Sequence, residues 1–292
     1  MNNLTSVESH FRFGENWRAY AEKVDEAAIE EAVHGLRRLA GSEMSGKRIL
    51  DIGCGSGLHA LAALRLGAVE IQGIDLDPNS VAAAQAVLTR YASQRPWKME
   101  QKSIFEMNPA QCGTFDMVYS WGVLHHTGDM FRAIHTAAEL VSLGGLFVFA
   151  LYRKTLLCPF WKWEKRWYAR ASSRRQRLAQ RLYTAMFRLG LRATGHKFDS
   201  YVDKYKTKRG MDFYHDVHDW LGGWPYESIS PEEVELVMRG LGFEQVRSFI
   251  TRGRRFGGRY LGLFGSGCDE YVYRKVETFP APAASIISNL PQ

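Results

Sequence analysis

Cysteine is scarce in this chain of 292 residues and gives no sign of a metal site or a disulfide. The four cysteines are Cys54, Cys112, Cys158 and Cys268. None belongs to a CxxC pair, so their spacing suggests neither a zinc site nor a disulfide scaffold. Scattered single cysteines are typical of proteins in a reducing compartment. We therefore expect a cytoplasmic protein without a structural metal.

Long apolar runs are also missing. No stretch approaches the roughly 18 apolar residues that a membrane-spanning helix needs. Residues 1–13 lack both the basic start and the apolar centre of a secretory signal. The sequence therefore predicts neither a spanning helix nor a secretory leader.

What the sequence does contain is a regular alternation of strand and helix patterns, which is typical of a parallel sheet covered on both faces. We expect an α/β fold, a Rossmann-like seven-stranded mostly parallel sheet with helices on both faces. It should carry one N-terminal helix over residues 17–40 and a helical insertion after the fifth strand. The strand patterns fall at residues 48–53, 69–77, 98–105, 115–122, 144–152, 243–250 and 269–276.

These patterns divide the chain into five predicted parts. They are an N-terminal helical cap (1–44), a Rossmann-like core (45–152), a basic and aromatic insertion (153–228), the C-terminal part of the core (229–276) and a tail that we expect to be disordered (277–292).

The most informative segment is LDIGCGSG at residues 50–57, where the first strand passes into a helix. Glycines let the backbone turn sharply and approach a ligand, and open parallel sheets bind ligands at this edge. A dinucleotide fingerprint would need glycine where Leu58 stands, and the GK[ST] of a P-loop is absent. Asp51 would repel a pyrophosphate but suits a ligand with an amino group. Asp75, at the end of the second strand pattern, can accept the hydroxyls of a ribose.

Four segments together give the chain a resemblance to the class I S-adenosylmethionine-dependent methyltransferases, in the broad group (types 11 and 12) that includes ubiquinone-biosynthesis-type methylases. The resemblance implies an enzyme with S-adenosylmethionine as its cofactor. The segments are LDIGCGSG (50–57), GIDLD (73–77), FDMVYSWGVLHH (115–126) and GGLFVFAL (144–151). FGENW at residues 13–17 is similar to a segment that covers the site in some of these methylases.

The resemblance also implies roles for individual residues. Asp51 and the loop glycines would line the methionine part of the cofactor, and Asp75 would hold its ribose. Many relatives hold the adenine with an Asp, but this chain has Ser103 at that place, so the hydroxyl or backbone of Ser103 would bond the base. The implied cofactor-binding residues are Asp51, Gly53, Cys54, Gly55, Asp75, Leu76, Ser103, Ile104, Trp121 and Val123.

Methyl transfer to a hydroxyl or an amine also needs a base, and two clusters can supply it. The first is His125, which follows the fourth strand and can act as a base or orienting group, although it can equally be a loop residue.

The second cluster lies at residues 209–227, which are dense in acids, histidines and aromatics. There His215 and Asp212 can deprotonate an acceptor, while the aromatics form walls or simply fold the insertion onto the core. The HxxH spacing of this cluster is too loose to predict a metal. The expected substrate-binding residues are Trp17, His126, Tyr214, Trp220, Trp224 and Tyr226.

Acidic residues are nearly absent from residues 153–192, where Glu164 stands alone among many arginines, lysines and aromatics. The mixture predicts amphipathic helices with a basic face. Three interpretations stay open: a lid over a small-molecule or sugar-type acceptor, which we favour; a peripheral membrane contact that serves a lipid or quinone acceptor; and RNA binding, the weakest, because no RNA-binding module is recognisable.

The sequence therefore predicts in-line transfer of a methyl group to an oxygen or nitrogen of a small-molecule acceptor. The alternatives are a lipid or quinone methylase, then an RNA methyltransferase, then an inactive cofactor-binding module. The identity of the acceptor and the oligomeric state have no signal in the sequence.

Overall fold

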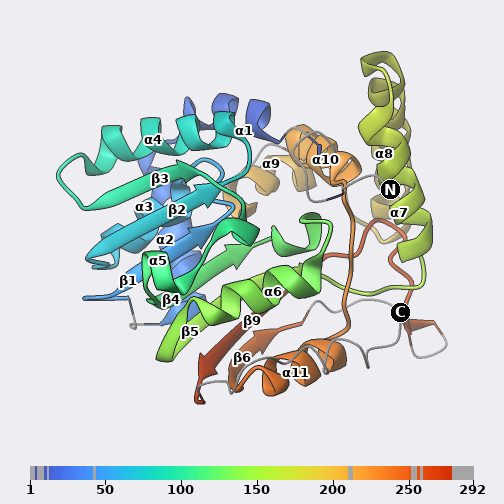
Figure 1. Cartoon of the computed structure of the whole chain (residues 1–292). Coiled ribbons are helices and arrows are strands. Elements are labelled where there is room, and N and C mark those ends of the chain that lie inside the picture. The colour runs from blue at the N-terminus through green and yellow to red at the C-terminus, as the bar shows by residue number, and fades with distance from the viewer. Residues whose placement is uncertain are drawn as a thin grey trace.

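The computed structural model describes residue 4 and residues 10–11, 13–41, 44–209, 213–250, 255–256 and 259–277, except the side chains of residues 204, 206–209, 215, 255, 256 and 259. Seven strands form the central sheet: β1 (Arg48–Ile52), β2 (Glu70–Asp75), β3 (Trp97–Gln101), β4 (Phe115–Trp121), β5 (Val141–Tyr152), β6 (Phe243–Phe249) and β9 (Cys268–Lys275). Their order is β3-β2-β1-β4-β5-β9-β6 (Figure 1). The first five are mutually parallel, and β9 runs antiparallel to both β5 and β6. The predicted fold class is confirmed.

The sheet is buried between two layers of helices. Successive residues of β1 point to opposite faces, so Ile49 packs into one apolar cluster and Leu50 into the other. The first cluster includes α2 (Glu26–Ala40), α3 (Leu58–Arg65) and α4 (Pro78–Ala92), and the second includes α6 (Met130–Glu139) and α11 (Pro231–Gly240). Shorter helices follow β3 and β4: η2 (Ile104–Glu106), α5 (Pro109–Cys112) and η3 (Leu124–His126). Because both faces are covered, the carboxyl edge of the parallel strands is where a ligand can enter.

The prediction of a single helix over residues 17–40 is wrong. The chain forms α1 (Gly14–Ala21) and then, after a turn, α2. Asp25 causes the break, because it adopts an extended backbone and its side chain accepts a hydrogen bond from the backbone N–H of Ala28 at 2.9 Å. An Asp at this position starts a new helix rather than continuing an old one. The break lets α1 turn away from α2 and pack along α4 (Figure 1).

Residues after β5 form a helical layer at one end of the sheet. It consists of α7 (Cys158–Arg170), α8 (Ser173–Ala193), α9 (Phe198–Arg209) and α10 (Phe213–Gly222). These helices share their own apolar cluster, which includes Trp161, Tyr168 and Tyr226. The packing is mainly aromatic, which explains why the sequence there lacks the aliphatic periodicity of the core.

A second excursion, between β6 and β9, was not predicted. It contains two short strands, β7 (Arg255–Phe256) and β8 (Arg259–Tyr260), and is bonded to the helical layer. The indole of Trp161 donates to the carbonyl of Gly262 at 2.7 Å, and the hydroxyl of Tyr183 donates to the carbonyl of Phe264 at 2.8 Å. The insertion after β5 therefore depends on residues about 80 to 100 positions further along the chain.

Candidate functional site

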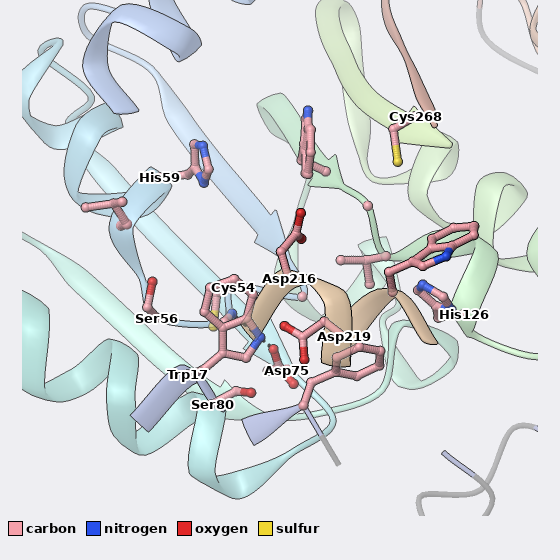
Figure 2. Close-up of a pocket in the computed structure, with 18 of the residues that line it drawn as sticks. Trp17, Cys54, Ser56, His59, Asp75, Ser80, His126, Asp216, Asp219 and Cys268 are labelled. Carbon is pink, nitrogen blue, oxygen red and sulfur yellow. Dashed lines mark hydrogen bonds between the residues drawn. The ribbon is translucent and has the colours of Figure 1, made fainter. Parts of the chain in front are cut away.

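A cavity of about 740 Å³ opens at the carboxyl ends of β1, β2 and β4 and continues into the helical layer. A volume of this size is in the range of ordinary small-molecule sites. Figure 2 shows its wall at the turn after β1, with Cys54, Asp75 and Trp17 around it. All ten residues that the family resemblance assigns to the cofactor line this cavity: Asp51, Gly53, Cys54, Gly55, Asp75, Leu76, Ser103, Ile104, Trp121 and Val123.

Asp51 is a buried carboxylate with an unsatisfied oxygen. It is only 4% exposed, and its Oδ2 atom has no hydrogen-bond partner among the described residues. Burial, and then the charge of Asp75, raise the pKa of Asp51 to about 7. A buried carboxyl without a partner is costly, and a ligand ammonium at this point would remove that cost. The residue thus fits the amino group of S-adenosylmethionine.

Two positions of the loop after β1 require glycine. Gly53 has a φ of 73°, and a Cβ atom there would come within 2.6 Å of Cγ1 of Val123. Gly55 has a φ of 53°, and a Cβ there would come within 3.1 Å of the Trp17 ring. Positive φ and close neighbours both exclude a larger side chain. The loop therefore packs between Val123, which follows β4, and Trp17 of α1.

Asp75 is held in place by backbone groups. Its Oδ2 accepts from the N–H of Gly55 at 3.1 Å, and its Oδ1 accepts from the N–H of Asp77 at 2.9 Å. Burial raises the pKa of Asp75 to about 6, against these hydrogen bonds, which lower it. Each carboxylate oxygen has a second lone pair, so the group can still accept a hydroxyl from the cavity.

Ser103 is occupied by local structure. The predicted third strand ends at Gln101, and Ser103 then caps η2: its Oγ accepts from the N–H of Phe105 at 3.3 Å and its own N–H donates to Glu106 at 2.8 Å. Its hydrogen-bonding groups therefore serve the turn, and its role toward an adenine stays a prediction. Trp121 is fixed similarly, since its indole N–H donates to Glu270 at 2.9 Å.

Helix α1 roofs the cofactor half of the cavity. The N–H of Gly14 donates to Asp77 at 2.9 Å, and the amide of Asn16 donates to Asp219 on α10 at 2.6 Å. Trp17 lines the cavity from the same helix and covers Gly55. The predicted covering segment thus lies over the glycine loop, and it also contacts the helical layer.

The half of the cavity inside the helical layer is aromatic and carries two acids. Asp216 and Asp219 project from one face of α10 toward the space that Trp17 and Asp75 also face (Figure 2). Tyr205 donates to Asp216, while burial raises the pKa of Asp219 to about 7. The aromatic lining residues here are Tyr152, Tyr183, Phe187, Tyr201, Tyr205, Phe213, Trp220 and Phe264. We call this half the aromatic chamber.

Neither acid was singled out from the sequence, although both lie in the cluster at residues 209–227. Their spacing of three residues places them on the same side of a helix, and this spacing is the sequence pattern from which a pair of acids facing one site can be predicted. Tyr152 at the end of β5 and Phe264 beyond β8 had none, because only the fold brings them to the chamber.

The predicted bases are placed very differently from one another. His126 lines the cavity, but its Nδ1 lies 2.6 Å from the carbonyl of Pro225 and burial lowers its pKa to about 3. His125 is fully buried and is not among the described lining residues, and its Nδ1 accepts a hydrogen bond from the backbone N–H of Tyr152 at 3.3 Å. Burial also depresses the pKa of His125. Asp212 and the side chain of His215 lie outside the described residues, so their catalytic roles stay predictions.

The predicted acceptor-binding aromatics separate into two groups. Trp220 lines the chamber, with its ring 5.2 Å from that of Tyr152. Trp224 and Tyr226 are buried in the core of the helical layer, and Tyr226 bonds Cys158 at 3.2 Å. Tyr214 is 55% exposed. For Trp224 and Tyr226, packing of the insertion onto the core accounts for the contacts observed, and the role of Tyr214 stays a prediction. In the described part of the chain no three His, Cys, Asp or Glu side chains gather as metal ligands.

Comparison with known proteins agrees with this geometry. Residues 20–246 match the family model described as a methyltransferase domain. The ubiquinone biosynthesis O-methyltransferase of Xanthomonas euvesicatoria pv. vesicatoria is 35% identical over 112 residues, 38% of this chain and 46% of that protein. The ribosomal protein L11 methyltransferase of Alteromonas mediterranea is 52% identical over 50 residues, 17% of each chain. The matches thus span less than half of these relatives.

Solved structures share the fold at low sequence identity. The N-methyltransferase NodS of Bradyrhizobium japonicum, in complex with S-adenosyl-L-homocysteine, has a TM-score of 0.50 at 13% identity and covers 91% of this chain and 100% of its own. An O-methyltransferase family protein of Burkholderia thailandensis has a TM-score of 0.51 at 16% identity, and the match covers 93% of this chain and 63% of that protein. The family match extends over most of the sheet, the glycine loop and the helical layer, and the chain therefore belongs to the methyltransferase domain family, within the class I S-adenosylmethionine-dependent methyltransferases.

Proposed function

We propose that this protein transfers the methyl group of S-adenosylmethionine to an oxygen or nitrogen of a small-molecule acceptor. The observation that carries the proposal is that the glycine loop after β1 and the aromatic chamber line the same cavity. A cofactor on the loop and an acceptor in the chamber would share one space. The aromatic walls favour an acceptor with a flat or apolar body, and the two acids favour a hydroxyl or amine on it.

The cofactor half supplies binding and orientation. Asp51 would hold the cofactor's ammonium, Asp75 would accept a ribose hydroxyl, and Trp17 would cover the ligand from above. When bound, S-adenosylmethionine supplies an electrophilic methyl group on a sulfonium. The protein's contribution is then mainly to hold the acceptor atom in line with that methyl group, since such positioning can lower a barrier by several kcal/mol, about 7 or more in favourable cases.

Asp219 is the group we assign to proton removal. It faces the cavity between the cofactor half and the chamber, and a pKa of about 7 leaves it ionised in about half of the molecules at neutral pH. Its Oδ would take the proton of an acceptor hydroxyl as the oxygen attacks, or the proton that an acceptor amine loses once it is methylated. His125 is a poorer candidate because it is fully buried beside Tyr152 and does not face the chamber. Asp216, which also lines the cavity, would orient the acceptor.

The test is transfer of labelled methyl from S-adenosylmethionine into a cell extract, followed by separation into polar metabolites, lipids and RNA. Label among the polar metabolites supports the proposal. Label in the lipid or the RNA fraction would replace the small-molecule acceptor with one of those classes. Cofactor binding by calorimetry without any label transfer would point instead to a binding module.

Asp75→Ala is the matched negative variant for this assay. It should weaken cofactor binding by about 2 kcal/mol, as for a lost hydrogen bond to a charged group, and lower transfer in parallel. Asp199→Asn removes an exposed acid of the helical layer outside the cavity lining and should leave both quantities unchanged.

A further inference from the structure

Helices α7 and α8 carry a concentration of exposed apolar side chains. Sixteen large apolar side chains are exposed among the described residues, and seven of them lie on these two helices. The α8 residues are Leu178 (58% exposed), Leu182 (59%), Met186 (51%) and Leu189 (66%), and the α7 residues are Phe160 (48%), Trp163 (64%) and Trp167 (39%). Single exposed leucines are normal, but a cluster of this kind marks a contact surface.

The exposed residues of α8 form one stripe. Their spacing of four, four and three residues places them within an arc of roughly 80° on a helix of 3.6 residues per turn. The opposite side of the same helix carries Tyr183 and Phe187, which line the aromatic chamber. Helix α8 therefore has one apolar face turned into the protein and a second turned outward, and it lies at the edge of the molecule (Figure 1).

Positive charge borders the outward stripe. The nine exposed cations of the two helices are Lys162, Arg166, Arg170, Arg174, Arg175, Arg177, Arg181, Arg188 and Arg192. Glu164 is the one acid in these helices, and it is buried. By helical geometry Arg175 falls within the apolar arc, and Arg174, Arg181 and Arg192 fall within about 60° of its edges. Neither helix thus offers an exposed carboxylate to pair with these arginines.

We propose that α7 and α8 form a docking surface for a membrane that contains anionic lipid. A helix that lies in a bilayer interface presents an outward apolar stripe to the acyl chains and flanking cations to anionic headgroups. The α8 surface combines both features, and the exposed tryptophans of α7, Trp163 and Trp167, are of a residue type enriched in the headgroup region.

Other occupants fit the surface less well. RNA would use the arginines but would have no contact for the four aliphatic side chains of the α8 stripe, since single-stranded binding uses stacking on aromatic rings. A second copy of the chain in a two-fold dimer would place the same nine cations against themselves. The described part of the chain has no helix able to span a membrane, so the contact we propose is peripheral.

The experiment is flotation of the full-length protein with vesicles of phosphatidylcholine alone and of phosphatidylcholine with phosphatidylglycerol in roughly equal parts. We expect binding to the second kind only, and release at high salt because the charge contribution is screened. Leu178→Ser/Leu182→Ser/Met186→Ser should reduce partitioning into the vesicles about a hundredfold or more, since three apolar side chains that the bilayer would bury are lost. Arg174→Gln/Arg175→Gln/Arg181→Gln should also reduce partitioning and weaken its salt dependence, since three of the nine exposed cations are lost.

The matched control is Val69→Ser/Leu143→Ser/Leu236→Ser, which changes three equally exposed apolar residues outside α7 and α8. It should bind vesicles like the unaltered protein. An equal loss in the control, or no flotation of the unaltered protein with phosphatidylglycerol, overturns the proposal. A change from dimer to monomer caused by the α8 substitutions would show that a second copy of the chain occupies the surface, and it also overturns the proposal. The same holds if the protein binds single-stranded RNA but not vesicles, and only the Arg→Gln variant loses the RNA.

Discussion

The side-chain amide of Asn16 donates a hydrogen bond of 2.6 Å to the carboxylate of Asp219, across 203 positions of the sequence. Asn16 belongs to the roof over the glycine loop, and Asp219 belongs to the wall of the aromatic chamber. A hydrogen bond to a carboxylate favours its ionised form, so this contact lowers the Asp219 pKa against the effect of burial. Closure of the roof and the proton affinity of the proposed base are therefore coupled.

The coupling predicts the effect of Asn16→Ala. Without the donor, the Asp219 pKa should rise above about 7, and the pH at which turnover reaches half its maximum should move upward by the same amount. The measurement is the pH profile of kcat at saturating cofactor. Glu15→Ala, which changes an exposed neighbour on α1, should leave the profile in place. An unshifted profile for Asn16→Ala would separate the roof from the base.

Asp219→Asn tests the base itself. The asparagine oxygen can still accept from Asn16, so the roof should stay closed and cofactor affinity should change little. Turnover should fall by roughly 10²- to 10⁴-fold, the usual contribution of a general base. In the unaltered protein kcat should rise with pH and level off above about 7, because the ionised carboxylate is the active form. The variant should lose that rise.

Asp199→Asn is the control for this change and should keep both the rate and the pH profile. Full activity of Asp219→Asn would remove the residue from the proton path and return attention to the predicted bases His125 and His215. A fall in cofactor affinity equal to the fall in turnover would instead make Asp219 part of the roof only.

The cofactor half of the site could be predicted from the sequence because its determinants are local. The segment from Leu50 to Gly57 contains the strand end, the acid and the glycines, and the fold keeps them adjacent. The chamber could not be predicted in the same way. Asp219 meets Asn16, and Trp161 meets Gly262, only after folding, and neither pair has a short-range pattern.

The histidines illustrate the same limit. His125 and His126 are neighbours in the sequence and looked alike there. The structure separates them, because His126 faces the cavity while His125 packs against the Tyr152 ring at 3.9 Å. Which of two adjacent polar residues is exposed to a cavity depends on the twist of η3 and on residues from β5, and no residue type specifies that.

Gly53→Ala is predicted to abolish cofactor binding rather than folding. The positive φ alone should cost about 1–2 kcal/mol of stability, and the added methyl would also overlap Val123 at the loop. Gly46→Ala is the matched control, since Gly46 has the same φ of 73° but open space at its Cβ position. Both variants should unfold at lowered temperatures, with Gly53→Ala the lower of the two because of the overlap with Val123, and calorimetry should show lost cofactor binding in Gly53→Ala alone.

Adding Val123→Ala to Gly53→Ala should recover part of that binding, because the two closest atoms, the Val123 methyls, are then removed. Equal cofactor affinity in Gly53→Ala and Gly46→Ala would mean that the loop yields without cost and that its glycines do not shape the site.

Cofactor affinity should increase with pH up to about neutrality. In the free protein Asp51 has a pKa of about 7 and Asp75 of about 6, both raised first by burial. A ligand ammonium binds the ionised Asp51, so below pH 7 the carboxyl must first release its proton, which weakens binding by up to about tenfold per pH unit for each proton released. From about pH 5 to about pH 7 the dissociation constant should therefore fall, and calorimetry in buffers of different ionisation enthalpy should detect proton release.

Asp51→Asn should bind the cofactor more weakly at pH 7 and flatten this pH dependence, whereas Asp116→Asn, at the opposite end of the sheet, should retain it. An unaltered slope in Asp51→Asn would assign the titration to Asp75 and place the ammonium elsewhere in the cavity.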